Sequence, residues 1–283
     1  MIFERPDDKL YSVNEIEQYL RCPLGYYFRY VAGEKPTGNA FIALSLSMRE
    51  AILQWFEARS AGQSAGSAGD VVDLFRSLVA VRGYRTRAAD LVEAAEPALV
   101  SHIMRASSKC ESGSEPREIR KKASYHLHSM RSGIKGEIPL ILRDGTVIDI
   151  RVCMNGKKEA DLAKDFRLSA YALLSAGDKS IGEEFAPSRL EIPVRMDVLV
   201  IGRQPRAQHL RGTRSLDGLT RFKRLVELAA DGISKRAFPP THPNNWNCSS
   251  RWCAYYEVCS RSVKQPEVTP TFQTPKAQGV VQG

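Results

Sequence analysis

The sequence predicts an α/β fold with a helical insertion before the strands and a cysteine-rich region after them. Three observations support this prediction. Helical periodicity dominates the first half of the chain, a strand hairpin begins near residue 136, and helices alternate with a further strand after it. At 283 residues the chain is long enough to bury a full hydrophobic core.

The first half is predicted to be mainly helical. The first helix begins at Ser12, because Ser12 and Glu15 have the spacing of a capping box. The aromatic residues at 26–30 follow this helix, and we expect them to pack in the core rather than stack on bases. Apolar residues three and four positions apart predict further helices over residues 41–58, 71–81, 88–104 and 117–130.

The second half changes pattern. Residues 136–143 and 146–153 are predicted to form a hairpin, because Asp144-Gly145 between them favours a tight turn. A helix over 163–175, a strand over 190–202 and an amphipathic helix over 216–236 are predicted to follow. Asp161 and Asp165 are expected to cap the helix that follows the hairpin.

We expect one domain over residues 1–262, followed by a disordered tail at 263–283 that is rich in Pro, Gln and Thr. Within this domain we predict three parts: a helical part at about 40–132, a sheet core at about 133–235, and a cysteine region at 236–262 together with Cys22.

The charge balance favours a polyanionic partner. The chain has 41 Lys and Arg residues against 32 Asp and Glu residues, a formal net charge of +9. Nucleic acid is the common partner of such proteins, although many basic proteins have none. We find no apolar run long enough to span a bilayer and no signal segment, so we expect a cytoplasmic protein with no membrane partner.

Four cysteines have the pattern of a metal site. Cys22 lies near the start of the chain, and Cys248, Cys253 and Cys259 follow the spacing C-x4-C-x5-C near its end. In a cytoplasmic protein this pattern favours metal binding over disulfides. Four thiolates can hold either a tetrahedral Zn²⁺ ion or an iron–sulfur cluster, and the spacing does not decide between them.

Several stretches, in this order, resemble the RecB-like branch of the PD-(D/E)XK nucleases, which includes exonucleases of helicase–nuclease complexes, phages and CRISPR systems. The matching stretches are Ser12 to Tyr27 with Cys22-Pro23, Met48 to Ile52, the hairpin Gly136 to Val152, Arg167 to Tyr171, and Gly232 to Pro240 with Trp246 to Cys259.

The resemblance implies a restriction-endonuclease-like core, in which helices flank a mixed β-sheet. It also implies hydrolysis of phosphodiesters with Mg²⁺ or Mn²⁺ held by carboxylates. For the cysteine site it favours a 4Fe–4S cluster on Cys22, Cys248, Cys253 and Cys259 over Zn²⁺.

The chain departs from the family pattern at four active-site positions. Arg49 stands where the family has a histidine, Pro139 where it has the first aspartate, Arg151 where it has a lysine, and Arg167 where it has a glutamine. Only the second acidic position, Asp149, and the tyrosine, Tyr171, are kept.

These departures disfavour metal-dependent cleavage. An arginine side chain is permanently cationic and has only hydrogen-bond donors, whereas a hard divalent cation needs several oxygen ligands. We expect Asp149 to pair with one of these guanidinium groups. We also expect Arg49, Arg151, Arg167 and Tyr171 to bind a nucleic-acid phosphate.

The sequence therefore favours a nucleic-acid-binding protein, with DNA the preferred ligand over RNA, that is catalytically inactive. It would act as a structural or recognition subunit of a DNA-processing or CRISPR-type complex. The basic stretches 117–122 and 203–214 can contact a nucleic-acid backbone or be solvated faces.

Two alternatives stay open. The first is an active Mg²⁺- or Mn²⁺-dependent DNA exonuclease with a shifted carboxylate pair, Glu137 and Asp149, in which Lys157 or Lys158 replaces the missing lysine. This alternative expects Glu137 on the same strand face as Pro139. The second is a structural protein that binds only other proteins.

Overall fold

The computed structural model describes residues 9–35, 40–64, 66–82, 89–107, 115–127, 132–178, 191–245, 247–250 and 252–262. The chain divides into two compact units, Met1–Thr241 and His242–Gly283. The predicted tail at 263–283 and Trp246 lie outside the described residues. The single domain expected over 1–262 stays a prediction.

The first unit is built on a six-stranded mixed sheet, as predicted. Its strands run in the order β1-β3-β4-β5-β6, and β2 pairs with β3. The β1–β3 and β4–β5 pairs are parallel, and the other pairs are antiparallel. The strands are β1 (Lys9–Ser12), β2 (Pro116–Leu127), β3 (Ser132–Leu142), β4 (Val147–Cys153), β5 (Glu191–Val200) and β6 (Arg206–Ser215).

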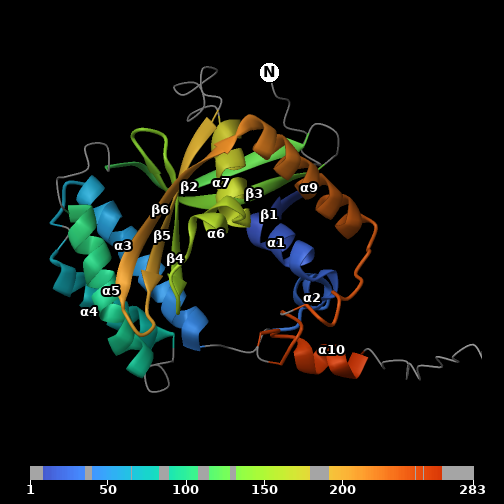
Figure 1. Cartoon of the computed structure of the whole chain (residues 1–283), viewed down its shortest axis with the longest axis horizontal. Coiled ribbons are helices and arrows are strands. Elements are labelled where there is room, and N and C mark those ends of the chain that lie inside the picture. The colour runs from blue at the N-terminus through green and yellow to red at the C-terminus, as the bar shows by residue number, and fades with distance from the viewer. Residues whose placement is uncertain are drawn as a thin grey trace, which may run out of the picture. The chain divides into compact units, whose positions relative to one another are not determined.

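Helices cover both faces of this sheet, and each face has its own apolar core (Figure 1). The α7 core includes Ile138, Leu168, Val198 and Phe222, and the α3 core includes Leu44, Phe75, Leu99 and Leu140. The helices on the α7 side are α1 (Val13–Arg21), α6 (Glu159–Ala163), α7 (Phe166–Gly177) and α9 (Leu216–Ser234). The helices on the α3 side are α3 (Ala40–Ser60), α4 (Ala68–Val81) and α5 (Ala89–Ser107).

Most predicted elements are confirmed within a few residues. The helices expected over 41–58, 71–81, 88–104 and 216–236 correspond to α3, α4, α5 and α9, and the hairpin is formed by β3 and β4. The helix expected over 163–175 corresponds to α7, and the short helix α6 precedes it. None of the helices in the described part of the chain is both long and apolar enough to cross a bilayer.

The start of α1 follows the predicted capping box. The Glu15 N–H donates to Ser12 Oγ at 3.1 Å, and the Ser12 N–H donates to Glu15 Oε2 at 2.7 Å. Cys22 lies just after α1, in extended backbone between α1 and α2 (Pro23–Tyr26). A π-helix, η1 (Tyr27–Val31), follows. Tyr26 and Phe28 are buried, as expected for core rings.

The helix predicted over 117–130 is wrong, because Pro116–Leu127 is the long strand β2. Alternate residues, Ala123, Tyr125 and Leu127, pack against or within the α7 core, which is the period of a strand. Lys121 lies on the same face and pairs with Asp178 at 3.7 Å, near the end of α7. The charged residues of this stretch make its alternation of apolar and polar positions hard to detect in the sequence.

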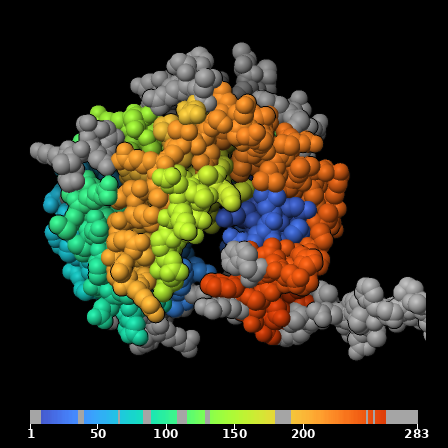
Figure 2. Space-filling view, in the orientation of Figure 1, coloured from blue at the N-terminus to red at the C-terminus, as the bar shows by residue number. Residues whose placement is uncertain are grey.

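Two strands were not predicted. Strand β1 is only four residues long, and β6 carries many polar residues in the stretch that we interpreted only as a basic segment. Ten consecutive residues of β6 pair antiparallel with β5. Because β6 is at the edge of the sheet, polar residues along it are typical. Figure 2 shows β6 as part of the orange surface band beside α5.

Strands β2 and β3 rotate where Arg120 and Pro139 face each other. Ile138 packs in the α7 core and Leu140 in the α3 core, although residues two apart in a regular strand share one face. Arg120 has a φ of 52°. The β3–β4 ladder ends at Leu140–Ile148, next to Pro139, which has no N–H to donate. Beyond this point β4 runs apart from β3.

The second unit contains the three late cysteines. Backbone turns hold them, because the N–H of Cys248 donates to Asn245 at 2.7 Å and that of Cys253 to Ser249 at 2.8 Å. Cys259 lies in α10 (Tyr256–Ser262). Tyr255, just before this helix, is buried.

The packing of α9 on α1 requires glycine at position 232. A Cβ at Gly232 would lie 2.1 Å from Tyr19 Oη, which donates to the Ala237 carbonyl at 2.8 Å. We expect Gly232→Ala to lower the free energy of unfolding by about 1–3 kcal/mol, measured by urea denaturation.

The same substitution should cost less in a Tyr19→Phe background, which removes the clashing oxygen. Gly69→Ala is the control, because a Cβ there meets only Ser67 Oγ at 3.4 Å and alanine favours a helix. Equal stability of wild type and Gly232→Ala would contradict this packing.

Candidate functional site

Asp149 lies at the centre of the candidate site. It is on β4, one residue beyond the end of the β3–β4 ladder, and its side chain is fully buried. Its neighbour Val147, two residues earlier on the strand, packs in the α7 core. Asp149 and Arg151 therefore point from the same face of the sheet towards α7.

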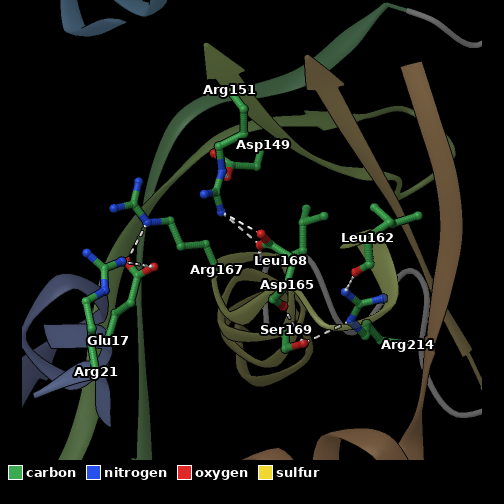
Figure 3. Close-up of polar contacts among 10 residues, drawn as sticks. All are labelled: Glu17, Arg21, Asp149, Arg151, Leu162, Asp165, Arg167, Leu168, Ser169 and Arg214. Atoms are coloured by element: carbon green, nitrogen blue, oxygen red, sulfur yellow. Dashed lines mark hydrogen bonds and ion pairs between the residues drawn. The ribbon is translucent and has the colours of Figure 1, made fainter. Parts of the chain in front are cut away.

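The guanidinium group of Arg151 bridges two carboxylates (Figure 3). Its Nε donates to Asp149 Oδ2, and its Nη2 lies 2.9 Å from both carboxylate oxygens of Asp165. Burial lowers the pKa of Arg151, but the charges of Asp149 and Asp165 outweigh this effect and raise it above its ordinary value. The predicted ion pair of Asp149 is thus formed, and Arg151 is its partner.

Asp165 connects this bridge to the start of α7. Its Oδ1 accepts from the Leu168 N–H at 2.9 Å, so it is the N-cap that we expected. Burial raises the pKa of Asp165, and the Arg151 charge opposes this rise without cancelling it. Its contact with Arg151 was not predicted, because the two residues are 14 positions apart and belong to different elements.

Arg167 forms a second ion pair beside the first. Its Nε donates to Glu17 Oε2 at 2.8 Å, and Glu17 Oε1 lies 3.5 Å from Arg21 Nη2 on the same helix, α1. Figure 3 shows Arg167 and Arg21 on either side of Glu17. Glu17 was not predicted as a site residue, because its only local signal in the sequence is its i,i+4 spacing from Arg21.

Arg49 and Tyr171 complete the set of predicted site residues. Tyr171 on α7 is buried, and burial together with the nearby Asp149 charge raises its pKa to about 12. The Arg49 charge acts on Tyr171 in the opposite direction. The Arg49 Nε is buried without a hydrogen-bond partner, and no carboxylate within the described ranges pairs with this guanidinium group.

Glu137 is not brought together with Asp149. A Cβ at the preceding residue, Gly136, would contact Val13 and Leu174 in the α7 core. Successive side chains of a strand alternate, so Glu137 points to the opposite face, towards the α3 side. The expectation that Glu137 shares the face of Asp149 fails because β3 rotates at Pro139.

The site therefore contains two groups of ion pairs, one around Arg151 and one around Glu17. Asp149, Asp165 and Glu17 supply three carboxylates, and Arg151 and Arg167 neutralise them through the contacts described above. One buried acceptor is left over, since Asp149 Oδ1 has no hydrogen-bond partner among the residues that the structure describes. The arrangement places a fixed cation where two carboxylates meet.

The four predicted cluster ligands are divided between the two units. Cys22 belongs to the first unit, where its Sγ accepts from the Gly25 N–H at 3.4 Å, and Cys248, Cys253 and Cys259 belong to the second. All four cysteines are partly buried. Their donor chemistry fits either an iron–sulfur cluster or zinc, and the shared site stays a prediction.

Comparisons with known proteins identify a family. Residues 11–260 match the sequence model of the PD-(D/E)XK nuclease superfamily. Among solved structures, a protein named "Putative exonuclease" from Eubacterium rectale is similar at 10% identity and a TM-score of 0.48, over 85% of this chain and 87% of that one. SSO0001 is similar at 13% identity and a TM-score of 0.39, over 93% and 90% of the two chains. No curated protein sequence matches. The assignment rests on the match over residues 11–260.

The Arg151 bridge predicts a specific stability effect. Arg151→Met leaves the fully buried Asp149 without its counter-ion, so we expect the free energy of unfolding to fall by about 3–5 kcal/mol in chemical denaturation.

The double variant Arg151→Met/Asp149→Asn should recover part of this loss, because it also removes the buried charge. Arg143→Met is the matched control, since it breaks an exposed pair with Glu115 (3.2 Å) and should change stability little. If Arg151→Met were no more damaging than this control, the bridge would not stabilise the fold.

Proposed function

The chain belongs to the PD-(D/E)XK nuclease superfamily, and from this premise we propose that it binds nucleic acid, with DNA the preferred ligand, without cleaving it. In this proposal it is a cytoplasmic member of the RecB-like branch. It serves as a structural or recognition subunit of a DNA-processing or CRISPR-type complex, together with other protein subunits.

One observation carries the proposal: the bridge from Arg151 to Asp149 and Asp165. Metal-dependent phosphodiester hydrolysis needs carboxylate oxygens that are free to bind Mg²⁺ or Mn²⁺. Here a permanently charged guanidinium group occupies both carboxylates, and displacing it would leave that charge without its partners. Pro139, at the position of the family's first aspartate, supplies no ligand at all.

Arg49 is the group best placed to hold a backbone phosphate. Of the three arginines predicted to bind phosphate, Arg151 and Arg167 are already paired with carboxylates. Arg49 is therefore the remaining candidate. The Arg49 Nε is buried without a partner among the described residues, and a guanidinium group in that state gains from a phosphate oxygen. The formal net charge of +9 supports the same kind of ligand.

The alternative, an active DNA exonuclease, is supported by a different carboxylate pair from the one predicted. Asp149 and Asp165 meet at one guanidinium group, with Asp149 Oδ1 unpartnered in the described part of the chain, whereas Glu137 lies on the other face. If Arg151 moved aside, these two residues could bind Mg²⁺ or Mn²⁺. Such an enzyme would depend on displacing a buried ion pair.

The cysteine site is part of the proposal. We infer that Cys22, Cys248, Cys253 and Cys259 hold a 4Fe–4S cluster, with Zn²⁺ as the alternative occupant. Thiolates suit both, and the C-x4-C-x5-C spacing of the three late cysteines supports a metal site. When bound, such a group would connect the two ends of the fold and stabilise it.

Binding and cleavage assays test the proposed function. Fluorescence anisotropy with labelled single- and double-stranded DNA should show binding that is unchanged by EDTA, and gels with Mg²⁺ or Mn²⁺ should show no degradation. Arg49→Ala should weaken binding and reduce the slope of log affinity against log salt by about one phosphate contact.

Arg59→Ala is the matched control on the same helix, because Arg59 is exposed and lies over the Trp55 ring at 5.4 Å. It should leave both the affinity and the salt slope close to those of wild type. Metal-dependent degradation that Asp149→Asn abolishes would establish the exonuclease instead. If the protein did not bind DNA at low salt, the result would favour the alternative of a structural protein that binds only other proteins.

The cofactor is tested by metal analysis. Protein purified without oxygen should be brown and contain about four iron atoms and matching sulfide per chain. Cys22→Ser should lose the iron and the visible absorbance, whereas Cys153→Ser, a partly buried cysteine on β4 outside the set, should keep both. Colourless protein that contains zinc, and that loses one zinc ion per chain in Cys22→Ser, would identify the alternative occupant.

A further inference from the structure

Two histidines and an aspartate meet on the face of the sheet opposite Asp149. His102 comes from α5, Asp197 from β5 and His209 from β6, directly opposite Asp197 in the strand register. One potential ligand atom from each of the three residues lies within 4.8 Å of the others. His102 and Asp197 are buried, and the His209 side chain is 7% exposed.

Asp197 fixes the orientation of His209. The distance between His209 Nδ1 and Asp197 Oδ1 is 2.6 Å. Burial raises the pKa of Asp197, but the His209 bond and the Arg195 charge outweigh this and hold the pKa well below its usual range. An ionised carboxylate accepts a hydrogen bond from Nδ1–H, and in this tautomer of the imidazole ring the lone pair lies on Nε2.

His102 offers a second nitrogen ligand. Burial lowers its pKa to about 4, so its imidazole ring is neutral at pH 7. It stacks on His209 with ring centroids 5.5 Å apart and an angle of 19° between the planes. Neither of its ring nitrogens, nor His209 Nε2, has a hydrogen-bond partner among the described residues. Buried nitrogens left without partners cost stability, which a bound ligand would recover.

We propose that His102, His209 and Asp197 form a binding site for one divalent transition-metal ion of the Zn²⁺ class. The two imidazole rings supply nitrogen ligands, and Asp197 supplies the carboxylate that orients His209. Neutral imidazole and carboxylate ligands are a common donor set for zinc. The ion would satisfy nitrogens that otherwise have no partner.

Arg195 determines which ions the site accepts. Its Nε and Nη2 lie 2.9 Å and 3.0 Å from the two oxygens of Asp197. Because the carboxylate oxygens are shared with a guanidinium group, the ligand set is mainly nitrogen. Nitrogen ligands favour Zn²⁺ and its neighbours over Mg²⁺ or Mn²⁺, which prefer oxygen. This site is therefore chemically distinct from the carboxylates around Asp149.

The burial of the site favours a structural role. An ion there would join α5 to β5 and to the edge strand β6, which packs beside that helix (Figure 2). Because His102 and Asp197 are buried, a substrate could not reach the ion, which suits stabilisation rather than catalysis. Zn²⁺ should thus stabilise this edge of the sheet without taking part in any reaction on DNA.

The test compares the zinc response of the full chain with that of His102→Phe. Wild type dialysed against EDTA and then supplied with Zn²⁺ should bind about one more zinc ion per chain than the variant, measured by mass spectrometry of the metal. Zn²⁺ should also raise the melting temperature of wild type by more than it raises that of His102→Phe. With Co²⁺, the ion lost in the variant should lack thiolate charge-transfer absorbance, which separates it from the cysteine site.

Two further variants sharpen the result. Asp197→Asn should bind Zn²⁺ about 10–100-fold more weakly, as expected for a residue that orients a ligand. His126→Gln, a histidine on β2 outside the cluster, should bind Zn²⁺ as wild type does. Phenylalanine at position 102 removes both unpartnered nitrogens, so the metal-free variant should fold at least as stably as metal-free wild type. Equal zinc content and equal thermal response in wild type and His102→Phe would overturn the proposal.

Discussion

The contact between Arg151 and its two aspartates is the constraint on which the rest of the site depends. Asp149 is fully buried on β4, and Asp165 caps α7, so one guanidinium group both neutralises a charge in the core and fixes a helix against the sheet. Arg167 and Glu17 extend this pattern to α1. The three arginines inferred from the sequence therefore do not act alike, because two of them serve the fold and only Arg49 is left available.

Pro139 affects the site in two ways. It has no carboxylate for a metal ion, and it lies where the backbone of β3 rotates. The ladder between β3 and β4 stops beside it, and β3 presents opposite faces before and after it. Asp149 and Arg151 share the face of Val147 towards α7, whereas the rotation of β3 carries Glu137 to the other side of the sheet. One residue thus changes both the chemistry and the path of the strand.

Much of the fold could be predicted from the sequence, and the failures have physical reasons. The amphipathic helices and the Asp144-Gly145 hairpin are local features, and they were confirmed. A helix was predicted where β2 lies, because long charged side chains obscure the alternation of apolar and polar residues there. The pairing of Asp149 with Arg151 was anticipated, since two residues apart on a strand share a face. The contacts of Glu17 and of the His102 cluster were not predicted, because only tertiary packing brings these residues together. The ligands of the cysteine site stay a prediction.

The bridge at Arg151 also constrains how this site can change by substitution. The guanidinium group of Arg151 is the counter-ion of the buried Asp149. A shorter or neutral side chain at position 151 would leave Asp149 without a counter-ion unless a metal ion bound there. Sequences that change one member of the bridge alone would be less stable. In evolutionary terms the bridge acts as a ratchet, so descendants of this chain are expected to keep Arg151 together with Asp149 and Asp165.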